Sequence, residues 1–295
     1  MTAATTTTRT THTLEVPGAL LTYDVRRNGD SDAPALFLIG SPKGAAGYGT
    51  LAGFFADRTV VTYDPRGSER SRRTDGAATS TPEEHADDLH RIIAAVGHGP
   101  VDLFASSGGA VNALALVARH PEDVRTLVAH EPPLAALVPD SEHALAACRD
   151  ISETYQRDGM GPAMAKFIAI VSHQGPITAE YLAAPAPDPA MFGLPSEDDG
   201  SRDDVLLGQN MLSCTSYQPE VEALRAASTR IVVAVGAESE GQLARRGGEA
   251  VAERLGTTPV VFPSGHAGFL GGEYGQTGQP EPFAARLREV LTGQA

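Results

Sequence analysis

The sequence predicts an α/β fold in which helices flank a mostly parallel central sheet and a helical cap is inserted into the core. Short apolar segments alternate along the chain with segments whose apolar residues recur at helical spacing, the pattern of parallel strands joined by crossover helices. This alternation stops after residue 133 and resumes near residue 230, which indicates an insertion. The chain of 295 residues is also long enough for one large α/β domain with an insertion.

The predicted strands are short and rich in apolar and β-branched residues. An entirely apolar run such as residues 35–40 suits a strand that is buried on both faces of a parallel sheet. The predicted strands cover residues 20–25, 35–40, 59–63, 101–104, 124–129, 231–236 and 260–262. The predicted helices of the core cover residues 48–55, 82–96, 109–119, 243–255 and 282–291. Thr81 followed by Pro82 is typical of an N-cap with proline at the first helical position, so the second of these helices is expected to begin there.

The division into domains follows from the same segments. Residues 1–12 are rich in Thr and Ala and have little apolar surface to bury, so a disordered or frayed tail is expected there. Residues 13–133 and 219–295 are expected to form the α/β core. Residues 134–218, called the cap segment below, contain predicted helices at 141–157 and 160–171 and are otherwise loop-like.

Composition excludes several classes of protein. There are 23 Lys and Arg residues against 37 Asp and Glu residues, and the formal net charge is −14, which argues against binding nucleic acid or an anionic membrane. The two cysteines, Cys148 and Cys214, are too few for a disulfide scaffold. No segment resembles a secretory signal or reaches the roughly 20 apolar residues that span a bilayer, so a cytoplasmic location is expected.

The segment with the clearest chemical meaning is Ala-Ser-Ser-Gly-Gly at residues 105–109, which lies directly between a predicted strand and a predicted helix. A sharp turn from strand to helix exposes its central side chain and needs small neighbours, which is the arrangement of a nucleophile elbow. Ser107 is therefore the candidate nucleophile. The alternative is an ordinary turn rich in Gly and Ser.

A serine hydroxyl needs a base, and His266 is the candidate because it follows the last predicted strand in a loop of small residues. Histidines on amphipathic helices, such as His85, are expected to face solvent. The acid that would orient the imidazole is left open between Glu131 and Glu238. Each follows a predicted buried strand whose end lies at the same edge of the sheet as Ser107.

An oxyanion hole needs two backbone N–H groups directed at the developing charge. Gly108, directly after the candidate nucleophile, is expected to supply one. Ser41 is expected to supply the other, because the neighbouring Pro42 has no N–H. Asp64 is interpreted as a structural residue that caps its own turn.

The substrate pocket is expected to be apolar and to be formed largely by the cap segment, although the same side chains would equally suit the core of the cap. Its candidate residues are Tyr48, Met191, Phe192, Met211 and Tyr217. Since the sequence contains no metal-binding pattern and no glycine-rich nucleotide motif, no cofactor and no metal are expected. The expected partner is a small-molecule substrate, and a homodimer is the assembly considered.

Together these motifs resemble the α/β-hydrolase family. The resemblance rests on residues 105–109, on Ile39-Gly40-Ser41-Pro42, on Tyr63-Asp64-Pro65-Arg66-Gly67 and on the late Gly265-His266. Within that family the chain distantly resembles the zearalenone lactonases, whose elbow is Ser-Ser-Gly and whose acid is the glutamate of a His-Glu dipeptide. This resemblance implies that Glu131, preceded here by His130, is the acid rather than Glu238.

The resemblance and the residues imply a carboxylic ester or lactone hydrolase. The expected reaction is cleavage of a small, largely apolar ester or lactone by a serine hydrolase, through an acyl-enzyme. Two alternatives stay open: a cofactor-free lyase or cyclase, and a non-catalytic ligand receptor on the same scaffold.

Overall fold

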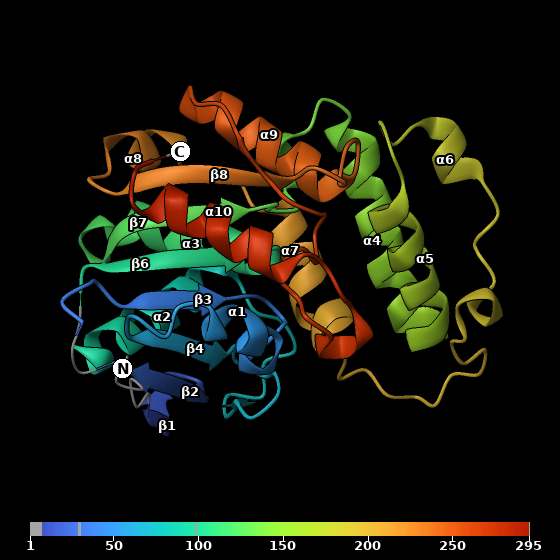
Figure 1. The fold of residues 1–295 in the computed structure, drawn as a ribbon. Helices are drawn as coiled ribbons and strands as arrows, with labels where there is room; N and C mark the ends of the chain where they lie inside the picture. Colours follow the sequence, from blue (N-terminus) through green and yellow to red (C-terminus); the bar gives the residue numbers. More distant parts are fainter. Residues whose placement is uncertain (1–7, 29–30, 98, 295) are drawn as a thin grey trace.

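A nine-stranded mixed sheet forms the centre of the described chain (Figure 1). The computed structural model describes residues 8–28, 31–97 and 99–294. In order across the sheet the strands are β1 (Thr8–Val16), β2 (Ala19–Arg27), β4 (Val60–Asp64), β3 (Leu36–Ile39), β6 (Val101–Ser106), β7 (Val124–His130), β8 (Arg230–Gly236) and β9 (Val260–Phe262), and β5 (Arg72–Arg73) pairs with β2. All pairings from β4 to β9 are parallel, whereas β2 is antiparallel to β1, β4 and β5. The predicted mostly parallel sheet is confirmed.

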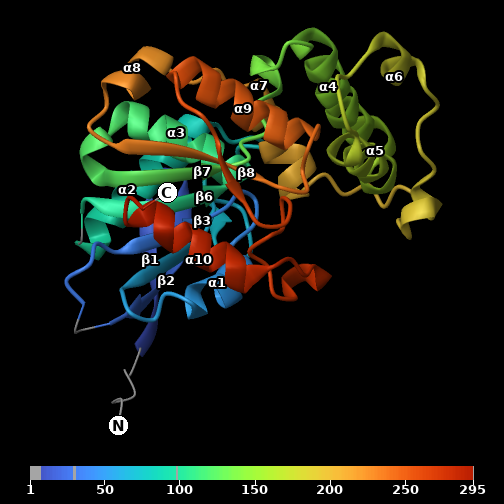
Figure 2. The same cartoon turned by 45° about the horizontal axis from the view of Figure 1, so that its top comes forward.

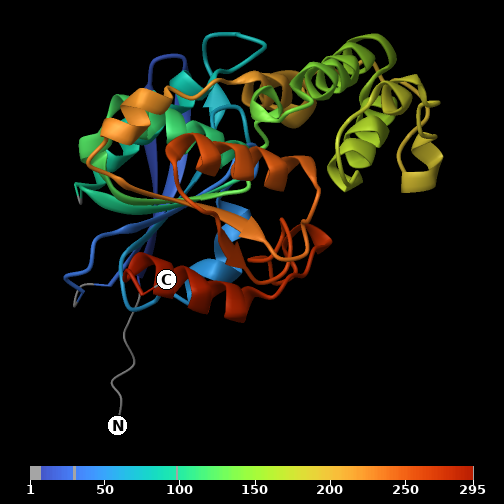
Figure 3. The same ribbon diagram turned by 90° about the horizontal axis from the view of Figure 1, so that it is seen from above.

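Helices cover both faces of this sheet, as Figure 3 shows from above. The core helices are α1 (Gly49–Gly53), α2 (Pro82–Val96), α3 (Gly108–Arg119), α8 (Val221–Ala226), α9 (Leu243–Leu255) and α10 (Pro280–Leu291). Side chains of α2, α3, α8 and α9 belong to one hydrophobic cluster, and those of α1 and α10 belong to a second cluster on the opposite face. Helix α2 begins as predicted, because the Thr81 and Glu84 side chains each accept the other's backbone N–H in a capping box.

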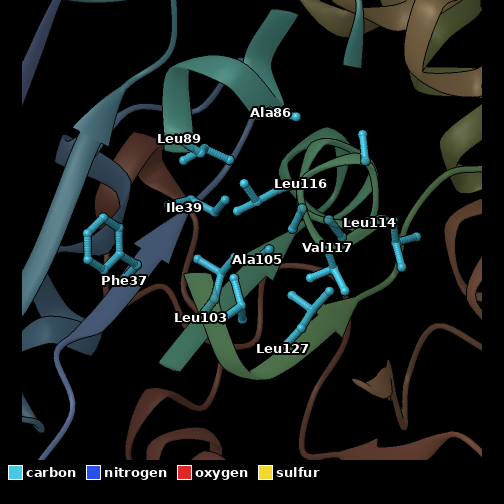
Figure 4. Packing of buried hydrophobic residues seen from close by; sticks show 14 of the residues in the cluster. Phe37, Ile39, Ala86, Leu89, Leu103, Ala105, Leu114, Leu116, Val117 and Leu127 are labelled. Atoms are coloured by element: carbon cyan, nitrogen blue, oxygen red, sulfur yellow. The ribbon is translucent and has the colours of Figure 1, made fainter. Parts of the chain in front are cut away.

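The larger cluster fixes the strands that precede the candidate site. Leu103 of β6 and Leu127 of β7 lie beneath α3, in the same cluster as Leu116 of that helix (Figure 4). All three side chains are fully buried, and each such burial contributes roughly 1.5–3 kcal/mol. The carboxyl ends of β6 and β7 therefore have well-defined positions relative to α3.

The expected frayed tail is wrong for residues 8–12, and residues 1–7 lie outside the described residues. Residues 8–12 belong to β1, which pairs with β2 along its whole length. Their side chains add to this pairing, because Arg9 and Thr11 donate hydrogen bonds to the buried Asp24 carboxylate. Thr is β-branched and favours strands, and backbone pairing with a neighbour does not need apolar side chains.

Between β7 and β8 the chain leaves the sheet and forms the helices of the cap segment, which lie beyond one end of the strands in Figures 1 and 2. These are α4 (Ser141–Asp158), α5 (Met160–Ser172), α6 (Ala179–Ala183), a π-helix (Val205–Asn210) and α7 (Met211–Ser216). A third hydrophobic cluster, with side chains such as Ile151 and Tyr155, lies among them.

No helix in the described ranges combines the length and the apolar character needed to cross a membrane. The two cysteines, Cys148 in α4 and Cys214 in α7, are both free and buried.

Candidate active site

Ser107 lies at the sharp turn between β6 and α3, where the sequence predicts it. Its backbone has φ 59° and ψ −132°, a strained conformation for a residue other than glycine. The next two residues must be small: a Cβ on Gly108 would lie 2.6 Å from the Ser41 carbonyl oxygen, and one on Gly109 would lie 2.6 Å from the Gly40 Cα. The turn therefore presents the Ser107 side chain at the carboxyl edge of the sheet.

Two backbone N–H groups lie beside this turn. Gly108 is the first residue of α3, so its N–H points out of the helix end that carries partial positive charge. The Ser41 carbonyl packs closely against Gly108, which brings the loop after β3 next to the elbow. Within the described residues neither the Ser41 nor the Gly108 N–H donates a hydrogen bond. Both remain available to an incoming oxygen atom.

His266 and Glu131 are in direct polar contact. His266 Nδ1 lies 2.7 Å from Glu131 Oε2. The other carboxylate oxygen, Oε1, accepts the Gly236 N–H at 2.8 Å. Glu131 directly follows β7 with a positive φ of 48° and is fully buried, whereas 40% of the His266 side chain is exposed. The carboxylate is thus held rigidly, and the imidazole is oriented by it.

Glu131 stays ionised in this position. Burial acts to raise its pKa, but the hydrogen bond from His266, the charges of His130 and His266 and the Gly236 N–H together lower the pKa to about 2. An ionised carboxylate at Nδ1 keeps the proton on that nitrogen and leaves Nε2 free to accept another.

Glu238, the other candidate acid, has different partners. Its carboxylate accepts hydrogen bonds from Ser264 Oγ at 3.3 Å and Gln279 Nε2 at 3.1 Å. Both contacts lie on the exposed surface. Within the described residues Glu238 has no hydrogen bond to His266, so the geometry favours Glu131.

Ser107 and His266 line the same cavity of about 400 Å³. In the described part of the chain no hydrogen bond joins their side chains. Catalytic hydrogen bonds are often long or poorly aligned in the absence of a ligand. Apolar side chains form most of the cavity wall, and they include Pro133, Phe167, Ile170, Leu206, Met211 and Leu243. Of these six residues, only Met211 is among the pocket residues predicted from the sequence.

Of the other predicted pocket residues, one lines a cavity and three do not. Tyr48 lines a second, adjoining cavity and donates its hydroxyl to the Ile39 carbonyl at 2.6 Å. The prediction was wrong for Met191 and Phe192, which are 78% and 39% exposed on a 3-10 turn outside both cavities. It was also wrong for Tyr217, which packs against the hydrophobic cluster beneath α3. Apolar character alone does not indicate which surface a cap residue faces.

A buried polar cluster behind Ser41 was not predicted. Asn210 Oδ1 lies within hydrogen-bond distance of Ser41 Oγ at 3.2 Å, Ser80 Oγ at 3.3 Å and His85 Nε2 at 3.2 Å. His85 is 1% exposed, which corrects the expectation that it faces solvent. Burial lowers the pKa of His85 to about 3, so the imidazole is neutral. Asn210 comes from the cap segment, and this contact links the cap to the loop that carries the Ser41 N–H.

Two further residues near the site have clear structural positions. His130 is fully buried, bonds Ser106 Oγ through Nδ1 at 3.1 Å and stacks on His266 with ring centroids 5.9 Å apart. Asp64 Oδ1 accepts the Ala45 N–H at 2.8 Å and Oδ2 accepts from Arg70, which agrees with a structural role.

One group among the described residues has the composition and spacing to hold a metal ion. His90, His120 and Asp123 place one ligand atom each within 4.8 Å of one another, and His90 Nδ1 already contacts Asp123 at 2.6 Å. His120 follows the end of α3 opposite to Ser107, so this group is separate from the candidate active site.

Comparisons with known proteins concern the family and the fold of this chain. A family model described as the alpha/beta hydrolase fold matches residues 42–165. An uncharacterized hydrolase, YraK, from Bacillus subtilis (strain 168) is 30% identical over 285 residues, covering 95% of this chain and 95% of that protein.

Solved structures show the same fold. The enol-lactonase from Burkholderia xenovorans LB400 matches with a TM-score of 0.65 at 17% identity, over 95% of this chain and 100% of that chain. A thermophilic esterase from Thermogutta terrifontis matches with a TM-score of 0.66 at 21% identity, over 97% of this chain and 99% of that chain.

Proposed function

Because this chain belongs to the alpha/beta hydrolase family, we propose that it is a serine hydrolase that cleaves a small, largely apolar ester or lactone through an acyl-enzyme. The observation that supports this most directly is the 2.7 Å contact between His266 and the buried Glu131 carboxylate. His266 and the strained Ser107 line one cavity, and Glu131 contacts His266, which supports their assignment as base, nucleophile and orienting acid.

In the proposed reaction His266 Nε2 takes the proton of Ser107 Oγ as that oxygen attacks the carbonyl carbon of the substrate. Glu131 holds the Nδ1–H tautomer and stabilises the imidazolium that forms. The N–H groups of Ser41 and Gly108 would bind the carbonyl oxygen as it becomes negative.

The tetrahedral intermediate then loses the alcohol. Its C–O bond breaks, and His266 returns the proton to the leaving oxygen. Water, deprotonated by His266, then attacks the acyl-enzyme. The bond between the acyl carbon and Ser107 Oγ breaks, His266 returns the proton to Ser107, and the acid is released. In a lactone the leaving alcohol stays tethered to the acyl group. The apolar wall of the 400 Å³ cavity supports a small, largely apolar acyl or alcohol part.

Labelling with a fluorophosphonate probe, together with hydrolysis of p-nitrophenyl esters, tests the proposal. The wild-type protein should take up the probe at Ser107 and hydrolyse short esters. Ser107→Ala should lose the label and lower kcat by on the order of 10⁴-fold or more. Ser106→Ala is the matched control and should keep the label.

Two outcomes would overturn the proposal. If folded Ser107→Ala kept full esterase activity, Ser107 would not be the nucleophile. If the wild-type protein bound esters or lactones but was neither labelled nor active, a ligand receptor would be the better description.

A further inference from the structure

The second cavity, of about 480 Å³, has a different character from the first. It shares six lining residues with the apolar cavity, Ser107 and His266 among them, and its other lining residues are different. Beyond the shared residues, its wall includes the charged Lys43, Glu69 and Asp204 and the hydroxyl groups of Ser68 and Tyr274. A substrate whose scissile carbonyl lies at Ser107 would therefore have an apolar and a polar arm available.

Lys43 is the cation of the polar arm. Its stem packs on the backbone of the turn after Ser41, because a Cβ on Gly47 would lie 2.6 Å from Lys43 Cγ and Cδ. Its ammonium lies 5.3 Å from the ring centroids of both Phe269 and Tyr274. Cation–π contacts of this kind hold a charge in place without neutralising it.

Three carboxylates near the polar arm accept other donors, and one of them, Asp204, accepts the Leu207 N–H at 2.8 Å. Glu273 accepts the N–H groups of Thr50 at 2.8 Å and Gly271 at 2.6 Å. Glu69 accepts the Tyr274 hydroxyl at 3.2 Å. Lys166, the other lysine of the chain, pairs with Asp150 at 2.6 Å, whereas Lys43 forms no ion pair within the described residues.

A half-buried ammonium without a carboxylate partner is costly, since water is partly removed from it. Burial lowers the pKa of Lys43, and the negative charge of Glu273 opposes that effect. A negatively charged group on a substrate would stabilise the Lys43 ammonium and offset the hydration that it loses on burial.

The loop above Lys43 is strained. Tyr274 has φ 54° and ψ 26°, a left-handed conformation that bulky residues rarely adopt. The loop is closed by hydrogen bonds from Gly272 N–H to the Gln276 carbonyl and from Gln276 N–H to the Glu273 carbonyl. These contacts hold the Tyr274 ring over the ammonium, and backbone strain of this kind is concentrated at functional sites.

We propose that the polar arm is a carboxylate subsite, in which the Lys43 ammonium binds a carboxylate carried by the ester or lactone substrate. The inference rests on the proposed function, because it assigns the substrate class of the same site. Lys43 would determine specificity and take no part in bond cleavage. The preferred substrates would be monoesters of short dicarboxylic acids or carboxylated lactones.

The test compares charged and neutral esters of equal length. The p-nitrophenyl monoesters of succinic, glutaric and adipic acids are each paired with the butyric, valeric or hexanoic ester, after subtraction of spontaneous hydrolysis. In the wild type we expect at least one charged ester to have the higher kcat/KM. Lys43→Met should lower the charged-to-neutral ratio of kcat/KM by roughly 10-fold or more, mainly through KM. Lys43→Arg should retain part of the preference.

Lys166→Met is the matched control, because it removes the only other lysine and should leave the ratio at its wild-type value. Hydrolysis of the neutral esters with the same ratio in wild type and Lys43→Met would overturn the subsite and leave the proposed function standing. If no ester were hydrolysed, the proposed function would fail by itself.

Calorimetric binding of adipate measures the subsite without turnover. We expect binding to Ser107→Ala that is lost on adding Lys43→Met and retained on adding Lys166→Met. Equal binding to all three proteins would overturn the inference.

Discussion

Glu131 and His266 are 135 positions apart in sequence and lie 2.7 Å apart in space. Glu131 follows a central strand and is fully buried, whereas His266 lies in the loop after the last strand and is partly exposed. The carboxylate also accepts the Gly236 N–H at 2.8 Å, which holds it in position. The pair therefore combines a rigid acid with an imidazole that can reach into the cavity.

The first prediction concerns this pair. Glu131→Gln keeps the shape of the side chain but removes the charge that holds the His266 tautomer, so kcat should fall by roughly 10³–10⁴-fold. Glu238→Gln is the control and should leave kcat close to the wild-type value. Steady-state kinetics with a p-nitrophenyl ester measures both. A large loss in Glu238→Gln with little change in Glu131→Gln would reverse the assignment.

The second prediction concerns acid stability. The pKa of Glu131 is lowered from 4.5 to about 2 in the folded protein, which corresponds to roughly 3 kcal/mol. A carboxyl with a lowered pKa contributes stability above its unfolded pKa and loses it as the pH falls through the folded value. The free energy of unfolding should therefore decrease between about pH 5 and pH 2 more steeply in the wild type than in Glu131→Gln. Urea unfolding at several pH values measures this. Parallel plots of unfolding free energy against pH for the wild type and Glu131→Gln would contradict the prediction.

The third prediction concerns the cluster behind Ser41. Asn210→Leu removes the acceptor shared by Ser41, Ser80 and His85. Ser80 and His85 still bond each other at 3.0 Å, whereas the buried Ser41 hydroxyl is left unpaired, which should lower the free energy of unfolding by about 1–3 kcal/mol. We also expect a lower kcat at similar KM, since the loop carrying the Ser41 N–H would lose its contact with the cap.

Asn112→Leu is the matched control for this variant. The amide of Asn112 is buried in α3 and has no hydrogen-bond partner among the described residues, so its removal should be neutral or stabilising. Equal losses of unfolding free energy and of kcat in Asn210→Leu and Asn112→Leu would show that the shared acceptor is unimportant.

The fourth prediction concerns the glycines of the elbow. In Gly109→Ala the added Cβ would lie 2.6 Å from Gly40 Cα, and two backbones cannot move apart without displacing the turn. We expect the free energy of unfolding to fall by about 1–3 kcal/mol or more, together with reduced fluorophosphonate labelling of Ser107. Gly53→Ala, where nothing lies within 4 Å, should instead stabilise α1 by about 0.5–1 kcal/mol. Chemical denaturation compares the two, and similar effects would refute the steric argument.

Much of the fold was predictable because its signals are local. The alternation of short apolar strands with amphipathic helices, the Thr81 cap of α2 and the small residues around Ser107 each involve residues a few positions apart. The strand at residues 8–12 was not predictable in this way, because Thr-rich chain can be a free tail or an edge strand. Its pairing with β2 decides between them.

The choice between Glu131 and Glu238 shows the same limit at the site. Both residues follow strands of the parallel sheet and lie at its carboxyl edge, so their positions along the chain do not distinguish them. The orientation of each side chain does: Glu131 turns inward at a positive φ and meets His266, whereas Glu238 bonds Ser264 and Gln279 at the surface.

By itself the sequence determined the alternation of strands and helices from β2 onward, the turn that presents Ser107 and the position of His266 after the last strand. These depend on backbone preferences and hydrophobic periodicity within short segments. Only the tertiary structure decided which acid meets the histidine, which cap residues line the cavities, and that His85 and Lys43 lie beside the site. Such contacts join residues far apart in the chain, and their geometry depends on how whole layers of helix and sheet pack together.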